Sequence, residues 1–106
     1  MVRVNRTADV INELHFKVEA PFDRVGNALD RLGAVTILET SELHVLGRLS
    51  SGHGIIARPA FPDSVDVIVV GEADDHEQVA LEFSTMLGQL LECEVGEPGP
   101  LPSDLV

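Results

Sequence analysis

The chain has 106 residues, of which 44% are hydrophobic, and its 18 acidic and 7 basic residues give a net charge of −11. This length supports one domain with a single core, and no apolar run approaches the ~20 residues that a membrane-spanning helix needs. The acidic charge disfavours direct binding to nucleic acid or to an anionic membrane surface, because both repel negative charge.

The beginning of the chain and its cysteine content favour a cytoplasmic protein. Residues 1–11 carry Arg3, Arg6 and Asp9 where a secretory signal would have an apolar segment. The single cysteine, Cys93, cannot form an internal disulfide, which fits a reducing compartment. We expect residues 1–11 to form an N-terminal arm or an edge strand.

A strand and a helix follow the arm. Leu14, Phe16 and Val18 alternate with polar residues, so they face one side of a predicted strand. Pro21 is typical of a helix start, and a hydrophobic repeat at helical spacing then continues to Gly33 through Phe22, Val25, Ala28, Leu29 and Leu32. Gly26 inside this helix costs about 1 kcal/mol relative to alanine, which indicates either a close approach to the sheet or an unoptimised position.

Four more strands and a second helix are predicted further along the chain. Period-two alternation predicts strands at 35–40, 43–50 and 64–72, and a shorter one at 54–58. Asp75 and Gln78 have the spacing of a helix N-cap and its N3 partner, and a hydrophobic stripe then runs toward Gly96. Residues 96–106 contain Pro98, Pro100 and Pro102, and we expect a flexible C-terminal tail there, so that one domain covers residues 12–95.

These elements predict an α+β fold with two layers, in which two helices lie on one face of an antiparallel sheet in the order β-α-β-β-β-β-α. Strand parity and the helical stripes predict one hydrophobic core, made of Phe16, Val18, Val25, Leu29, Leu32, Val67, Val69, Phe83 and Leu87. The other face of the sheet is then free of helices.

That second face is the candidate interaction face. Strand parity places on it His15, Leu38, His44, Leu46, Arg48, Ile68 and Val70. The four aliphatic residues together are too apolar for a surface that contacts only water. Three occupants stay open at this point: a second subunit, a bound apolar ligand, or the chain's own arm and tail.

One segment carries a family resemblance. The stretch around Pro21 reads Lys17-Val18-Glu19-Ala20-Pro21-Phe22-Asp23-Arg24-Val25, and Leu29 follows it. It resembles the opening of the helix-grip proteins, the START and polyketide-cyclase-like superfamily. In that superfamily a strand ends in an Ala-Pro step, enters a helix, and a long C-terminal helix closes the fold over a curved sheet. The resemblance implies a β-α-β4-α core of the TATA-binding-protein-like type. Gly26 replaces an aromatic residue common in the family, and no functional residue carries over.

The sequence contains no recognisable catalytic or metal-binding motif. The histidines His15, His44, His53 and His76 have no metal-ligand spacing, and no cysteine pair joins them. Across strands, His15 and His44 can face each other on the candidate interaction face, with Arg48 nearby. Since Cys93 lies between two glutamates, we expect a raised thiol pKa and no nucleophilic role. We therefore expect neither catalysis nor a cofactor.

Two classes of function fit these features. The first is a small acidic, non-catalytic interaction module that forms a homodimer and contacts another protein through the candidate interaction face or the tail. The second is a helix-grip type of protein that holds a small apolar ligand between the sheet and the long helix. The charge is also compatible with an acidic mimic that occupies a basic partner.

Overall fold

The computed structural model describes residues 12–61, 63–71 and 75–100. Within these ranges the elements are β1 (Asn12–Val18), α2 (Phe22–Arg31), β2 (Val35–Thr40), β3 (Val45–Leu49), β4 (Gly54–Ala60), β5 (Ser64–Gly71) and α3 (His76–Leu91). This order confirms the predicted α+β fold. The predicted N-terminal arm lies outside the described residues.

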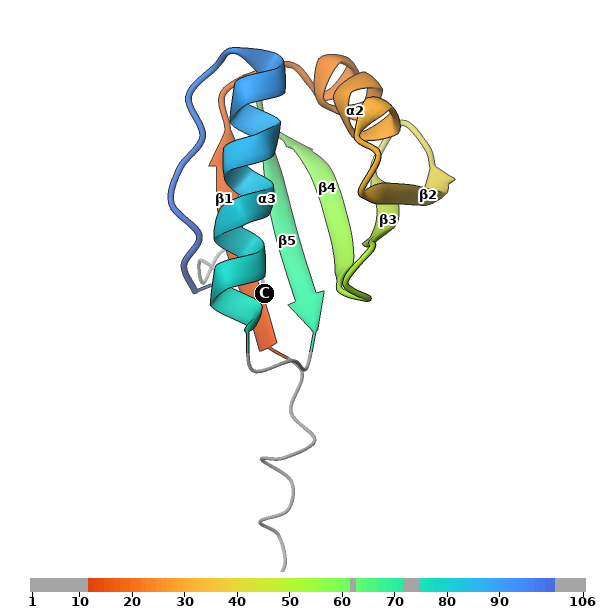
Figure 1. Cartoon of the computed structure of the whole chain (residues 1–106). Coiled ribbons are helices and arrows are strands. Elements are labelled where there is room, and N and C mark those ends of the chain that lie inside the picture. Colours follow the sequence, from red (N-terminus) through yellow and green to blue (C-terminus); the bar gives the residue numbers. More distant parts are fainter. Residues whose placement is uncertain (1–11, 62, 72–74, 101–106) are drawn as a thin grey trace, which may run out of the picture.

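The five strands form one antiparallel sheet in the order β1-β5-β4-β3-β2. Strands β2 to β5 follow one another as a meander, and β1 then pairs with β5, with His15 opposite Ile68. Figure 1 shows α3 over β1 and β5, and α2 beside it toward β2 and β3, so both helices cover the same face. The opposite face is not covered by any described helix.

The core lies between the helices and the sheet. Of the predicted core residues all are buried except Leu32, which is partly buried against the others. Phe16 from β1 and Phe83 from α3 make an edge-to-face contact, with ring centroids 5.9 Å apart and planes at 69°. The same periodicities that predicted the core therefore direct these side chains inward.

The close approach that we considered for Gly26 does not occur. A Cβ atom at this position would be 3.9 Å from its nearest neighbour, Val45 Cγ2, which is an ordinary van der Waals distance. Packing against the sheet therefore leaves room for a larger residue than glycine at this position of α2.

The start of α3 differs from the predicted capping box. Asp75 is the N-cap residue, but its side chain makes no capping hydrogen bond. The amide of Gln78 instead donates to Glu82 Oε2 at 2.8 Å, one turn further along the helix. The spacing of Asp75 and Gln78 allows a capping box, but the Gln78 side chain bonds to the next turn of the helix and not to the N-cap residue.

The end of α3 comes earlier than predicted. The helix ends at Leu91 rather than near Gly96, because Glu92 adopts the left-handed conformation, with φ of 56° and ψ of 46°. The backbone N–H of Cys93 then bonds to the carbonyl of Gly88 at 3.3 Å. A left-handed residue at this position is a common helix ending, although glycine is the usual residue there.

Residues 94–99, which we call the C-terminal segment, run alongside β1 and pair with it through two isolated antiparallel bridges, Val18–Val95 and His15–Gly99. Gly99 exchanges two backbone hydrogen bonds with His15, at 2.7 and 2.9 Å, and Gly96 N–H donates to Lys17 O at 2.9 Å. A further bond of 3.1 Å joins Glu19 N–H to Glu94 O. Residues 96–99 of the predicted flexible tail thus pair with β1, whereas residues 101–106 lie outside the described residues, so the flexible tail stays a prediction.

Pro98 permits this pairing because of its position in the C-terminal segment. Within the segment the donors to β1 are the N–H groups of Gly96 and Gly99, and Pro98 lies between them. An edge strand needs donors on one side only, so a proline on its other side removes no ladder hydrogen bond. The three prolines of residues 96–106 predicted a flexible tail, whereas Gly96 and Gly99 donate backbone hydrogen bonds to β1.

Candidate functional site

The face of the sheet opposite the helices, which we call the open face, is crossed by one straight row of side chains. The strand register aligns, from β1 to β2, His15, Ile68, Ile56, Leu46 and Glu39. The middle three residues are aliphatic. Ile56 and Leu46 are half-buried, whereas Ile68 is only 8% exposed because His15 and Ile56 flank it.

Charged residues lie on both sides of this apolar row. On one side Lys17 and Arg58 are both opposite Asp66, and on the other side Arg48 and Glu13 occupy the next positions. With Glu39, these residues give the described strands of the open face three basic and three acidic groups. The whole chain, in contrast, has 7 basic and 18 acidic residues. The described strands of the open face are therefore charge-balanced on a strongly acidic protein.

Most of the predicted interaction residues lie on this face. The register places there His15, Leu46, Arg48, Ile68 and Val70. Ile56 and Arg58 also lie on this face and belong to β4. Both lie within the strand predicted at 54–58, but no face was predicted for that strand.

Leu38 departs from the predicted parity. It is the extra residue of a bulge between Ile37 and Glu39, so that Glu39 rather than Leu38 is opposite Leu46. An inserted residue reverses the alternation of every position that follows it in the strand. Leu38 itself is 57% exposed at the free edge of the sheet.

The two histidines that we expected to face each other are far apart in the sheet. Strands β5 and β4 lie between β1, which carries His15, and β3, which His44 precedes. Each histidine instead contacts its own carboxylate. His15 Nε2 is 2.7 Å from Asp66 Oδ1, and the two side chains are 12% and 13% exposed. His44 Nε2 is 2.8 Å from Glu39 Oε2 in a more exposed pair.

A different pair of histidines meets inside the protein. His53, from the turn before β4, stacks on His76 at the start of α3, with ring centroids 5.2 Å apart and planes at 25°. Both residues are buried, at 3% and 4% exposure. His53 Nδ1 is 2.7 Å from Ser51 Oγ, but His53 Nε2 and both ring nitrogens of His76 have no hydrogen-bond partner among the described residues.

This burial changes the titration of His76. Its pKa is lowered from 6.5, first by burial and then by the neighbouring His53, while the Val69 backbone and the Asp75 and Glu77 carboxylates oppose the shift. His76 is therefore held in its neutral form inside the protein. No spacing in the sequence pairs residue 53 with residue 76, so only the three-dimensional arrangement reveals this contact.

Gly71 makes room for the His53 ring. A Cβ atom on Gly71 would lie 2.3 Å from His53 Cδ2 and 3.0 Å from Cγ and Nε2. These distances are far inside van der Waals contact, so the stacked histidines require a residue without a side chain at the end of β5.

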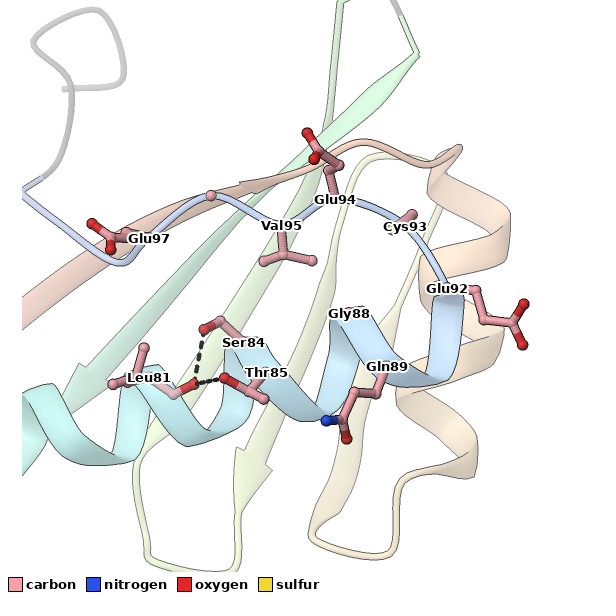
Figure 2. A pocket seen from close by; sticks show the side chains of 11 residues that line it. Leu81, Ser84, Thr85, Gly88, Gln89, Glu92, Cys93, Glu94, Val95 and Glu97 are labelled. Carbon is pink, nitrogen blue, oxygen red and sulfur yellow. Dashed lines mark hydrogen bonds between the residues drawn. The ribbon is translucent and has the colours of Figure 1, made fainter.

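A groove of about 630 Å³ lies between α3 and the C-terminal segment (Figure 2). Val95 points from the segment toward Gly88 on α3, whereas Glu94 points away from the helix. A Cβ atom on Gly88 would be only 3.0 Å from Val95 Cγ2, so this glycine lets the segment lie close to the helix. The hydroxyls of Ser84 and Thr85 both donate to Leu81 O at 2.9 Å and are thus satisfied within the helix.

Cys93 lies at one end of this groove, and its pKa is raised as predicted. The cause differs from the prediction, however. Burial is the largest contribution, and the carboxylate of Glu19, from the loop after β1, adds to it, while Arg24 and the backbone of Glu19 oppose the shift. The flanking Glu92 and Glu94 are not among the causes. A raised pKa keeps the thiol protonated and weakly nucleophilic.

Other kinds of site are not seen in the described ranges. No three His, Cys, Asp or Glu side chains in residues 12–61, 63–71 and 75–100 are arranged to hold a metal ion. Neither helix in these ranges combines the length and the apolar character that crossing a bilayer would need. The open face, with its apolar row and balanced charges, is thus the strongest candidate site on the sheet.

Comparisons with protein-family models, curated proteins and solved structures found no match to this chain. The resemblance of residues 17–25 to the helix-grip superfamily therefore stays a prediction. Any function must be argued from the geometry of the chain itself.

Proposed function

We propose that this protein is a small, non-catalytic interaction module that forms a homodimer through the open face. One observation supports the proposal: the open face combines an apolar row with an equal number of basic and acidic groups, on a chain with a net charge of −11. Two highly acidic molecules repel each other across most orientations. A charge-balanced face is the surface through which two copies can approach without that repulsion.

The arrangement of the charges fits a twofold dimer. In such a dimer each residue of one copy contacts the equivalent surface of the other, so a face must complement itself. Lys17, Arg48 and Arg58 give each copy cations to place against the other copy's exposed Glu13 and Glu39. The half-buried Ile56 and Leu46 would then become fully buried at the centre, where interfaces are most apolar.

The alternative of an apolar ligand between the sheet and the long helix has less support. Side chains fill that space, since Phe16, Phe83 and Leu87 are each no more than 1% exposed there. A cytoplasmic location fits the dimer, because the single cysteine cannot form an internal disulfide and the cytoplasm is a reducing compartment. A further protein would then bind to a surface that the dimer leaves free.

The test is the molar mass in solution, measured by light scattering and by sedimentation equilibrium. We expect twice the 11.4 kDa of one chain. Leu46→Asp should give the monomer because it places an unpaired charge at the centre of the interface. Leu43→Asp is the matched control, since Leu43 is 73% exposed outside the sheet and should leave the dimer intact.

A second variant protects the test against misfolding of Leu46→Asp. Arg48 is exposed on the open face, so Arg48→Glu should fold normally. It replaces a cation with an acid and should weaken the dimer by like-charge repulsion, with partial recovery in high salt. A parent protein that is monomeric at high concentration, or an Arg48→Glu dimer as tight as the parent, would contradict the proposal.

A further inference from the structure

A second groove, of about 620 Å³, lies on the helix side of the molecule, between α2 and the β2–β3 hairpin. We call it the α2 groove. Its floor is apolar and consists of Phe22 from α2, Ile37 from β2 and Val45 from β3. Its volume lies within the range of ligand-binding pockets, about 300 to 1,000 Å³.

Gly26 keeps this groove open. Residues 22, 26 and 30 of α2 are one turn apart, and all three line the groove. At the middle position, a Cβ atom would meet only Val45 Cγ2, at 3.9 Å, so the fold itself tolerates a side chain there. The space above the floor is therefore a consequence of the glycine and is not required by packing.

The rim of the groove carries the carboxylates of Asp23, Asp30 and Glu42, all three on exposed residues. In the part of the chain that the structure describes, the ion pairs are His15–Asp66 and His44–Glu39, so none involves a rim carboxylate. The nearby cation Arg24 is directed elsewhere, since its Nη2 donates to the Leu91 carbonyl of α3 at 2.6 Å. The groove thus combines an apolar floor with a negative rim.

We propose that the α2 groove binds a short basic segment of another protein, with one apolar side chain of that segment seated over Gly26. Charge complementarity supports this occupant, because the rim offers carboxylates to lysine or arginine, and the net charge of −11 attracts a basic partner from a distance. The groove lies on the opposite side of the sheet from the open face, so the inference does not depend on the homodimer.

The spacing of the rim indicates the pattern of the segment. Asp23 and Asp30 are seven positions apart on α2, which corresponds to roughly 10 Å along the helix axis. In an extended peptide, residues i and i+4 lie on the same side about 13 Å apart, and residue i+2 lies between them. Flexible basic side chains at i and i+4 can converge on the two carboxylates while an apolar residue at i+2 contacts the floor.

The experiment titrates the full chain, labelled with nitrogen-15, with a capped peptide of the pattern Lys-Ser-Leu-Ser-Lys, up to about 1 mM, where weak peptide binding is measurable. We expect amide shifts that cluster at Gly26, Ile37 and Val45. Gly26→Leu should fill the groove and weaken binding by about tenfold or more, while its other amide resonances remain those of the folded parent. No clustered shifts with the parent protein, or unchanged affinity in Gly26→Leu, would overturn the inference.

A pair of charge variants separates local recognition from general attraction to an acidic protein. The triple variant Asp23→Asn, Asp30→Asn, Glu42→Gln removes the rim charges. The control Glu82→Gln, Glu92→Gln, Glu97→Gln removes the same number of charges around α3 and the other groove. We expect weaker binding for the rim variant and binding close to that of the parent for the control. Equal loss in both variants would mean non-specific attraction and would overturn the inference.

Discussion

The buried histidine pair makes a sharp prediction about Gly71. Replacing Gly71 with alanine places a Cβ atom 2.3 Å from His53 Cδ2, and the ring cannot withdraw freely because it is 3% exposed and stacked on His76. Overpacking of this kind costs about 1 to 3 kcal/mol, and a clash this short against a buried ring favours the upper end, about 3 kcal/mol.

The same substitution should have the opposite sign without the ring. In a His53→Ala background the clash is removed, and Gly71→Ala should stabilise the protein by about 0.4 to 1 kcal/mol, because alanine restricts the unfolded chain. The backbone of Gly71 is outside the left-handed region, so alanine introduces no backbone strain there. The double-mutant cycle should therefore give a coupling of about 3 to 4 kcal/mol between the two positions.

Urea unfolding followed by far-ultraviolet circular dichroism is the appropriate assay, since the chain contains no tryptophan or tyrosine. Gly54→Ala is the matched control in the neighbouring strand, because its Cβ atom would meet only Val70 O at 3.9 Å. The reasoning is refuted if Gly71→Ala is as stable as Gly54→Ala, or if its cost is the same with and without the His53 ring.

Three other predictions follow from packing, titration and the sheet edge. Phe83→Ala should lower the free energy of unfolding by about 3 to 5 kcal/mol in denaturant titrations, since Phe83 is 1% exposed against Phe16, and an unchanged midpoint would contradict this. The pKa of His76 is lowered from 6.5 in the folded state. The contribution of His76 to the free energy of unfolding should therefore be complete above about pH 6.5 and should decline as the pH falls from there toward the lowered pKa. The decline should be at most about 1.4 kcal/mol per pH unit. His76→Leu should remove this part of the pH dependence, and an identical profile in that variant would exclude His76 as its source. Deleting residues 94–106 should lower the free energy of unfolding by about 2 kcal/mol or more, because it removes the backbone bonds to β1 and the Val95 contact. Deleting only residues 101–106 should lower it by less than about 0.5 kcal/mol. Equal melting temperatures for the two deletions would contradict the role of the C-terminal segment.

Periodicity predicted the order of the elements and eight of the 17 residues in the buried core cluster. Alternation in β1 and β5 and the stripe in α3 placed Phe16, Val67 and Phe83 on the inner side, because burial of one face dictates which residues can be apolar. Periodicity failed where a single residue breaks the repeat. The bulge at Leu38 reversed the parity of β2, and the left-handed Glu92 ended α3 before its apolar pattern ran out.

The candidate sites depended more on long-range pairing than on local pattern. Strand parity brought Leu46 and Ile68 onto one face, but only the strand order shows that Ile56 lies between them. The same order separates His15 from His44. His53 meets His76 because a turn and a helix start lie at the same end of the sheet, which no local spacing encodes.

The position of β1 has a consequence for how the chain folds. Both neighbours of β1 come from much later in the sequence: His15 is opposite Ile68 of β5 on one side, and on the other side it bonds to the backbone of Gly99. The hairpins between β2 and β5 close short loops and form quickly, whereas contacts of such long range bear a larger loop-closure entropy. We therefore expect strand β1 to join the sheet late in folding, after the meander has formed. During synthesis β1 emerges before both of its pairing partners. Substitutions in β1 should therefore alter the rate of unfolding more than the rate of folding.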